Sequence, residues 1–177
     1  NHYLGHSYVY LIASRLGVDM PDARLEFFNR GMSGHKVGDL RARWQKDTID
    51  MKPDVLSILI GINDVGRTVG NGKGFDKWEA DYRFILDESR KANPDLRLVL
   101  LDPFVLASGR LGDPASFKGK RVVVDRLCGI VDQLAENPLF AFSDPMVGWV
   151  SSEHYAAMLE DFAGAPQEAR QTVATFE

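Results

Sequence analysis

The chain has 177 residues and a formal net charge of −4 at pH 7. This length is usual for one domain, since domains run roughly 100–200 residues, and it suffices for one substantial core. Hydrophobic residues make up 45% and charged residues 26%, as is ordinary for a globular domain. The slightly acidic balance, with no long Lys/Arg cluster, argues against nucleic acid as the main partner, because phosphate binding needs a basic surface.

Several other classes are excluded by what the sequence lacks. No uninterrupted apolar run approaches the ~20 residues of a membrane span. No signal peptide is visible, which slightly favours the cytoplasm, although the chain starts at Asn1 without a methionine and a signal could precede it. The four histidines are scattered without a carboxylate or cysteine cluster, so no metal site and no cofactor are predicted. The single cysteine, Cys128, lies in an apolar helical pattern and is predicted to be a small buried side chain rather than a reactive thiol.

Helical and strand patterns alternate along the chain. Apolar spacing predicts, in order, a helix over 3–16, a strand over 25–28, a helix over 37–49, a strand over 55–60, a helix over 77–92, a strand over 96–101, a helix over 120–136 and a short strand over 139–142. Gly17 offers a stop to the first helix, and glycine-rich or polar loops are predicted over 69–74 and 108–119. Beyond residue 143 the pattern weakens, with a last helix predicted over 154–162 and a polar tail over 165–177.

The predicted strands over 55–60 and 96–101 are apolar almost throughout. Such runs are typical of strands that are buried on both faces of a sheet. Strands that alternate with helices argue for a parallel sheet covered by helices on both sides. Because we find no internal repeat and no interdomain linker, we predict a single α/β domain over 1–177.

Three of the predicted strands end in polar turns: Asn-Arg-Gly-Met-Ser-Gly-His over 29–35, Gly-Ile-Asn-Asp over 61–64 and Asp-Pro over 102–103. In open parallel sheets, ligands bind beyond the carboxyl ends of the strands. The glycines of the first turn let the backbone bend sharply and point an N–H outward, and the side-chain amide of Asn63 in the second turn is also a donor. Two donors that converge from different strands are what an oxyanion hole requires, although each turn alone also fits a simple turn or a helix cap.

The order of these segments resembles the conserved blocks of a known enzyme family. The runs over 29–34, 52–54 (Lys-Pro-Asp) and 61–64 resemble the second and third blocks of the SGNH hydrolase superfamily, the GDSL-like lipases and acylhydrolases. Residues 4–9 (Leu-Gly-His-Ser-Tyr-Val) resemble its first helix, and 101–104 (Leu-Asp-Pro-Phe) the end of its fourth strand. The resemblance implies a three-layer αβα flavodoxin-like fold with a parallel sheet, and ester hydrolysis by a Ser-His-Asp arrangement.

The resemblance covers about residues 4–135 and implies roles for both turns. By it, Gly34 donates its backbone N–H and Asn63 its side-chain amide to the oxyanion of the reaction. Asp64 belongs to the same block as Asn63 and is expected to hold that turn. The residues expected on the substrate side of the site are Ser33, His35 and Asp64.

The nucleophile of the family lies in a Gly-Asp-Ser block at the end of its first strand, which is central in the sheet and precedes the first helix. This sequence begins at Asn1, about where the loop after that strand would finish, so we expect the strand and its serine to be missing. A truncated sequence or gene fragment would account for this, and so would another segment that fills the slot, since an empty slot exposes two strand edges. Two echoes of the block, ending at Ser7 and Pro145, are not predicted nucleophiles: no strand can precede the first, and proline stands in the serine position of the second.

The last block of the family places an aspartate three residues before the catalytic histidine, usually with proline after it. The nearest match is Ser-Ser-Glu-His-Tyr, which makes His154 the candidate general base, with Ser151 in the aspartate position and Tyr155 in the proline position. A base must be oriented as well as close, and Glu153 or Asp144 could supply the carboxylate. The alternative is that His154 is an ordinary surface histidine, in a divergent segment that spans 143–177.

The leading hypothesis is therefore a serine esterase or acylhydrolase that acts on a small acyl or carbohydrate ester through an acyl-enzyme. The alternative is a non-catalytic binding or structural module that keeps the pocket and has lost the nucleophile. A flavodoxin-like nucleotide binder is disfavoured because no Gly-x-Gly-x-x-Gly follows a strand. A small-molecule ester is the expected partner, and the sequence carries no signal for an oligomeric state.

Overall fold

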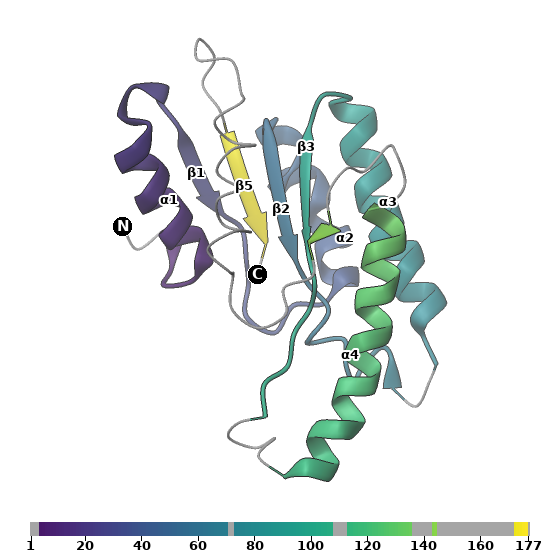
Figure 1. Ribbon diagram of the computed structural model, residues 1–177. Helices are drawn as coiled ribbons and strands as arrows, with labels where there is room; N and C mark the ends of the chain where they lie inside the picture. The colour runs from purple at the N-terminus through teal and green to yellow at the C-terminus, as the bar shows by residue number, and fades with distance from the viewer. Residues whose placement is uncertain (1–3, 71–72, 108–112, 136–142, 145–171, 177) are drawn as a thin grey trace.

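The computed structural model describes residues 4–70, 73–107, 113–135, 143–144 and 172–176 (Figure 1). The helices of this part of the chain are α1 (Tyr8–Asp19), η2 (Pro21–Ala23), α2 (Val37–Asp47), η3 (Ile49–Met51), α3 (Phe75–Ala92) and α4 (Pro114–Ala135). The strands are β1 (Glu26–Asn29), β2 (Val55–Leu59), β3 (Arg97–Leu101), β4 (Ser143–Asp144) and β5 (Thr172–Phe176). None of the described helices is long and apolar enough to cross a membrane.

The strands form one five-stranded sheet in the order β1-β5-β2-β3-β4, and every neighbouring pair is parallel (Figure 1). The predicted parallel α/β sheet is therefore confirmed. Parallel pairing brings the carboxyl ends of all the strands to one edge, where a ligand can meet several strand-end turns at once.

One of the inner strands of this sheet, β5, was not expected from the sequence. It lies between β1 and β2, with Ala174 opposite both Phe28 of β1 and Leu56 of β2. The prediction of a polar tail over 165–177 is thus wrong for Thr172–Phe176. The segment Thr172–Phe176 lies in the slot between β1 and β2, so those two strands have no exposed inner edges.

The ends of two helices also differ from the prediction. Gly17 does not stop α1, which continues to Asp19. The predicted loop over 108–119 is too long, because α4 already begins at Pro114. Asp113 explains the early start: its Oδ2 accepts the Ser116 N–H at 2.8 Å, as a helix N-cap does, and proline is favoured at the first helical position. The predicted strand over 139–142 and helix over 154–162 lie outside the described residues.

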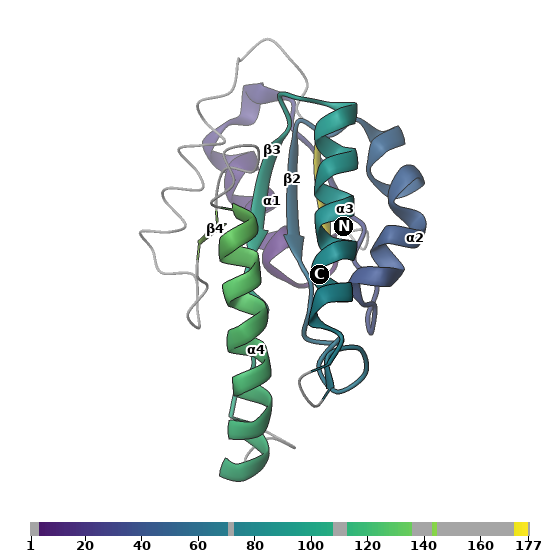
Figure 2. The ribbon, with the colours of Figure 1, turned by 90° about the vertical axis from the view of Figure 1, so that its right-hand side faces the viewer.

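Helices cover both faces of the sheet, as predicted. Figure 2 shows α1 and the pair α2–α3 on opposite sides of β2 and β3. The larger core joins α2, α3, α4, β2 and β3, and includes the fully buried Trp78 and Tyr82. The smaller core packs Ile12 and Leu16 of α1 against Val55 of β2. Between the helices, Trp44 Nε1 donates to Ser89 Oγ at 2.9 Å, which satisfies a buried polar pair within the core.

Two glycines in the loop between β2 and α3 allow the left-handed backbone conformation of this loop to be tested. Gly66 and Gly74 both have positive φ, +81° and +85°. A Cβ on Gly66 would meet no atom within 4 Å, whereas a Cβ on Gly74 would lie 2.0 Å from the carbonyl oxygen of Thr68. We expect Gly66→Ala to cost about 1–2 kcal/mol from the left-handed conformation alone, and Gly74→Ala about 3 kcal/mol or more, because overpacking is added. Urea unfolding of both variants measures the difference, and equal losses would contradict this account of the loop.

Candidate oxyanion site at the strand ends

Two turns at the carboxyl edge of the sheet flank the end of β5. One runs from the end of β1 to the start of α2, and the other follows β2 and leads toward α3. β5 ends between them, since Thr175 lies opposite Asn29 and Phe176 opposite Ile58. The arrangement therefore gathers three strand ends, two of which carry the predicted donors.

The turn after β1 is shaped by Asn29 and closed by His35. The Asn29 side chain accepts the Gly31 N–H at 2.8 Å and donates to the carbonyl of Leu4 at 3.1 Å. The His35 N–H donates to the carbonyl of Met32 at 3.1 Å, which makes a four-residue turn. No role was predicted for Asn29, although an asparagine shortly before a glycine at the end of a strand is a known signal for such a side-chain turn.

Gly34 lies inside this turn, exposed, with φ +82°. A Cβ here would meet no atom within 4 Å, so glycine is needed for the backbone conformation and not for space. Among the described residues, no acceptor binds its backbone N–H. Gly34 therefore presents a free backbone donor at the edge where the strands end.

Asn63 reaches across from the second turn to the first. Its Nδ2 donates to the carbonyl of His35 at 3.1 Å. A carboxamide nitrogen carries two protons, so one fixes the orientation of the half-buried side chain and the other has no acceptor among the described residues. The structure thus brings Asn63 to the turn that contains Gly34.

Asp64, the next residue, is fully buried, with a relative exposure of 0%. Its Oδ2 accepts the backbone N–H of Val37 at 3.2 Å, across the same gap that Asn63 bridges. Asp64 was expected on the substrate side, but a carboxylate at this depth meets the protein and not the solvent. Its contacts support the other part of the expectation, that it holds the turn.

Burial raises the pKa of the Asp64 carboxyl above the usual 3.8, despite the opposing hydrogen bond from Val37. The indole of Trp78 and the hydroxyl of Thr68 also favour the charged form. However, neither Asp64 Oδ1 nor Trp78 Nε1 has a partner at full hydrogen-bond geometry. The carboxylate is therefore incompletely compensated for its loss of water.

The end of β3 packs tightly on the second turn. Gly61 has φ +129°, and a Cβ there would lie 3.1 Å from Pro103 Cγ and 3.3 Å from the Trp78 ring. The only cysteine, Cys128 of α4, is half-buried, and its Sγ lies 3.4 Å from the carbonyl oxygen of Pro103. The prediction that Cys128 is buried is therefore only partly met, while burial and the nearby Asp102 raise the pKa of its thiol to about 12, which disfavours the reactive thiolate.

The other predicted residues fall in different places. Ser33 is exposed next to Gly34, and half-buried His35 has an Nδ1 that is buried without a partner. Ser7 begins α1 as its N-cap residue, and its buried Oγ makes no hydrogen bond. His154, with Glu153 beside it, lies outside the described residues.

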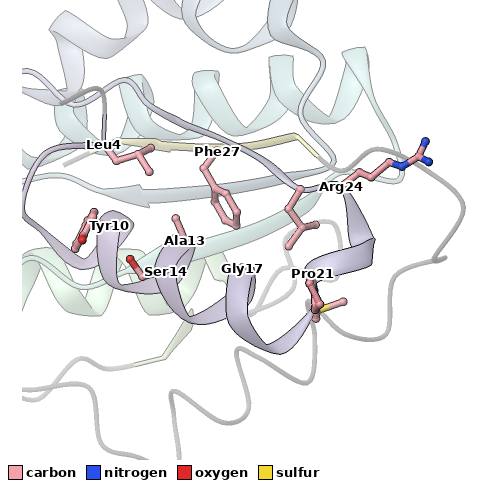
Figure 3. Close-up of a pocket in the computed structure, with 10 residues that line it drawn as sticks. Leu4, Tyr10, Ala13, Ser14, Gly17, Pro21, Arg24 and Phe27 are labelled. Atoms are coloured by element: carbon pink, nitrogen blue, oxygen red, sulfur yellow. The ribbon is translucent and has the colours of Figure 1, made fainter. Parts of the chain in front are cut away.

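The described residues contain no cluster of His, Cys, Asp or Glu that could hold a metal ion. A cavity of about 400 Å³ lies between α1 and β1, lined among others by Leu4, Tyr10 and Phe27 (Figure 3). None of the residues that line it belongs to the turns that carry Gly34 and Asn63. This cavity is consequently separate from the candidate site.

Comparisons with known proteins point in one direction. The model of the GDSL-like lipase/acylhydrolase family matches residues 2–170. An acetylxylan esterase from Geobacillus stearothermophilus is 33% identical over 164 residues, which cover 88% of this chain and 71% of that protein. Among solved structures, a candidate GDSL-like lipase from Parabacteroides merdae is 30% identical with a TM-score of 0.68, covering 94% of this chain and 74% of that one. A variant of an acetyl xylan esterase from Geobacillus stearothermophilus is 31% identical with a TM-score of 0.63, covering 92% and 69%.

Asp64 and the buried Asp81 of α3 should respond to pH with opposite signs. The pKa of Asp64 is raised, so the folded protein holds a proton that the unfolded chain releases, and this contribution to stability is lost as pH rises above about 3.8. Burial alone would raise the pKa of Asp81 too, but hydrogen bonds from Lys77 and Arg41 outweigh burial and lower it, so its contribution is lost as pH falls below about 3.8.

We therefore expect Asp64→Asn to gain stability relative to the parent as pH rises from about 3.8, and the penalty of Asp81→Asn to shrink as pH falls below it. Urea unfolding between about pH 3 and pH 7 measures both trends. Parallel pH profiles of the two variants would contradict the assigned directions.

Proposed function

Because this chain belongs to the GDSL-like lipase/acylhydrolase family, we propose that it hydrolyses carboxylic esters through a serine-bound acyl-enzyme. In this proposal the backbone N–H of Gly34 and the side-chain amide of Asn63 stabilise the negative oxygen of the tetrahedral intermediate. Donors that are already oriented lower the barrier because they need no rearrangement as the charge develops.

The observation that carries this proposal is the hydrogen bond from Asn63 to the carbonyl of His35. It holds the Asn63 amide against the turn that contains Gly34. The Gly34 N–H is exposed and has no acceptor among the described residues, and in this proposal it binds the same ligand oxygen as the second amide proton of Asn63. Two pre-positioned donors from different strands match the requirement for binding an oxyanion.

We assign the remaining steps by resemblance to the family. A serine Oγ attacks the acyl carbon while His154 takes its proton, and the alcohol then leaves with that proton. Water, activated by the same histidine, attacks the acyl-enzyme and releases the carboxylic acid. Either Glu153 or Asp144 orients the histidine. Family members carry the serine in a Gly-Asp-Ser block ahead of their first helix, and we assign that role to none of the described residues.

As substrate we propose an acetyl ester of a carbohydrate such as an acetylated xylo-oligosaccharide. The relatives include esterases whose names state that they act on acetyl xylan. The exposure of Ser33 and Gly34 supports this choice, because an open edge admits a bulky alcohol on the substrate. The acyl part then lies against the two donors, and the sugar extends outward.

A fluorophosphonate probe tests the serine mechanism. We expect covalent labelling of a serine in the complete, folded protein, found by mass spectrometry of the labelled peptide, together with release of acetate from acetylated xylo-oligosaccharides. Unfolded protein provides the control, since it should not be labelled. A folded protein that takes no label and hydrolyses no ester would instead be a non-catalytic module of this fold.

Asn63→Ala tests the proposed donor. Loss of one oxyanion donor should lower kcat about 10²–10³-fold with little change in KM, because the interaction strengthens in the transition state. Asn93→Ala is a matched control: its side chain also bonds a backbone carbonyl, that of Pro53 at 3.4 Å, but at the end of α3 and the start of β2. Equal activities of the two variants, with folding verified by circular dichroism, would remove Asn63 from the mechanism.

A further inference from the structure

The two turns of the candidate site are joined by two neighbouring hydrogen bonds. Asn63 Nδ2 donates to the carbonyl of His35 at 3.1 Å, and the Val37 N–H donates to Asp64 Oδ2 at 3.2 Å. Both bonds run between the same two segments, and they have opposite donor directions. The second bond involves neither of the proposed donors, yet it is adjacent to both turns.

The acceptor of the second bond is fixed in place by its own backbone. The carbonyl oxygen of Asp64 accepts N–H groups from Arg67 at 3.0 Å, Thr68 at 2.8 Å and Val69 at 3.2 Å. The Asp64 N–H donates to the carbonyl of Gly61 at 3.0 Å. The residue is fully buried, so the carboxylate cannot move toward solvent without opening this loop.

The donor of the second bond is the first residue of α2. Initial N–H groups of a helix have no partner within the helix and need one from outside. Val37 finds it on Asp64, and a carboxylate at this position also interacts favourably with the positive end of the helix dipole. Within its own helix, the start of α2 is closed by Asp39, whose Oδ2 accepts the Lys36 N–H at 2.9 Å. Asp64 thereby anchors the start of α2 to the other turn.

We propose that Asp64 is a positioning residue that sets the separation between the Gly34 and Asn63 donors. Gly34 lies three residues before Val37, and Asn63 directly precedes Asp64, so the Val37–Asp64 bond fixes the spacing of the segments that carry the donors. The role assigned here rests on the proposed esterase function. Asp64 Oδ1 has no hydrogen-bond partner, whereas buried polar atoms normally have one. The buried carboxylate therefore lowers the stability of the fold at this position.

The test compares Asp64→Ala with Asp64→Asn in the complete protein. Alanine removes the acceptor for the Val37 N–H, whereas asparagine keeps an oxygen for it. We expect Asp64→Ala to lower kcat about 10²-fold with KM nearly unchanged, and Asp64→Asn to restore most of that loss. Asp81→Asn is the control: Asp81 is also a buried aspartate that binds α2, through Arg41 at 2.6 Å, but its ion-pair partners, Arg41 and Lys77, belong to neither turn. Its kcat should equal that of the parent.

A second measurement does not depend on catalysis. Amide hydrogen exchange followed by NMR should show the Val37 N–H protected in the parent and in Asp64→Asn, and unprotected in Asp64→Ala. The Gly34 amide signal should shift in Asp64→Ala and stay in place in Asp81→Asn.

The outcomes separate this inference from the proposed function. A parent protein without esterase activity, but with the expected exchange pattern, would overturn the proposed function and keep the structural part of the inference. An active parent whose kcat is the same in folded Asp64→Ala would overturn the positioning role. A Val37 amide that stays protected in Asp64→Ala would overturn it as well.

Discussion

The hydrogen bonds between the turn after β1 and the turn after β2 are the constraint on which the candidate site depends. Each turn by itself is a short exposed segment that could adopt several conformations. Asn63 and Asp64 reduce this freedom by bonding the His35 carbonyl and the Val37 N–H. Because one side chain is half-buried and the other fully buried, water competes little for these bonds, and their geometry is kept.

The sheet supplies the rigid frame for this arrangement. β2 is buried and pairs in parallel with β3 on one side and β5 on the other. Since the carboxyl ends of parallel strands meet at one edge, the turns after β1 and β2 lie on either side of the end of β5. Gly61, pressed against Pro103 and Trp78, leaves the turn after β2 no room for a side chain at its base. The position of Asn63 is therefore set by the packing around Gly61 and by its own hydrogen bond to the His35 carbonyl.

Two kinds of prediction from the sequence had different outcomes. Strongly patterned segments, such as the apolar strands β2 and β3, formed where they were expected. The segment of β5, Thr-Val-Ala-Thr-Phe, was predicted to belong to a polar tail. Three of its five residues (Thr172, Val173, Thr175) are nevertheless β-branched and favour strands. Such a propensity is weak when it stands alone, because a strand gains most of its stability from its neighbours in the sheet. No local signal states which neighbours those are.

The sequence by itself determined the fold class, the family and the positions of Gly34 and Asn63 in strand-end turns, because hydrophobic periodicity and short motifs are local properties of the chain. Only the tertiary structure decided that β5 lies between β1 and β2, that the Asn63 amide bonds the carbonyl of His35, and that Asp64 is buried against Val37. These facts join residues 27 or more positions apart in the sequence. Contacts of that range depend on how whole elements pack, and no spacing along the chain encodes them.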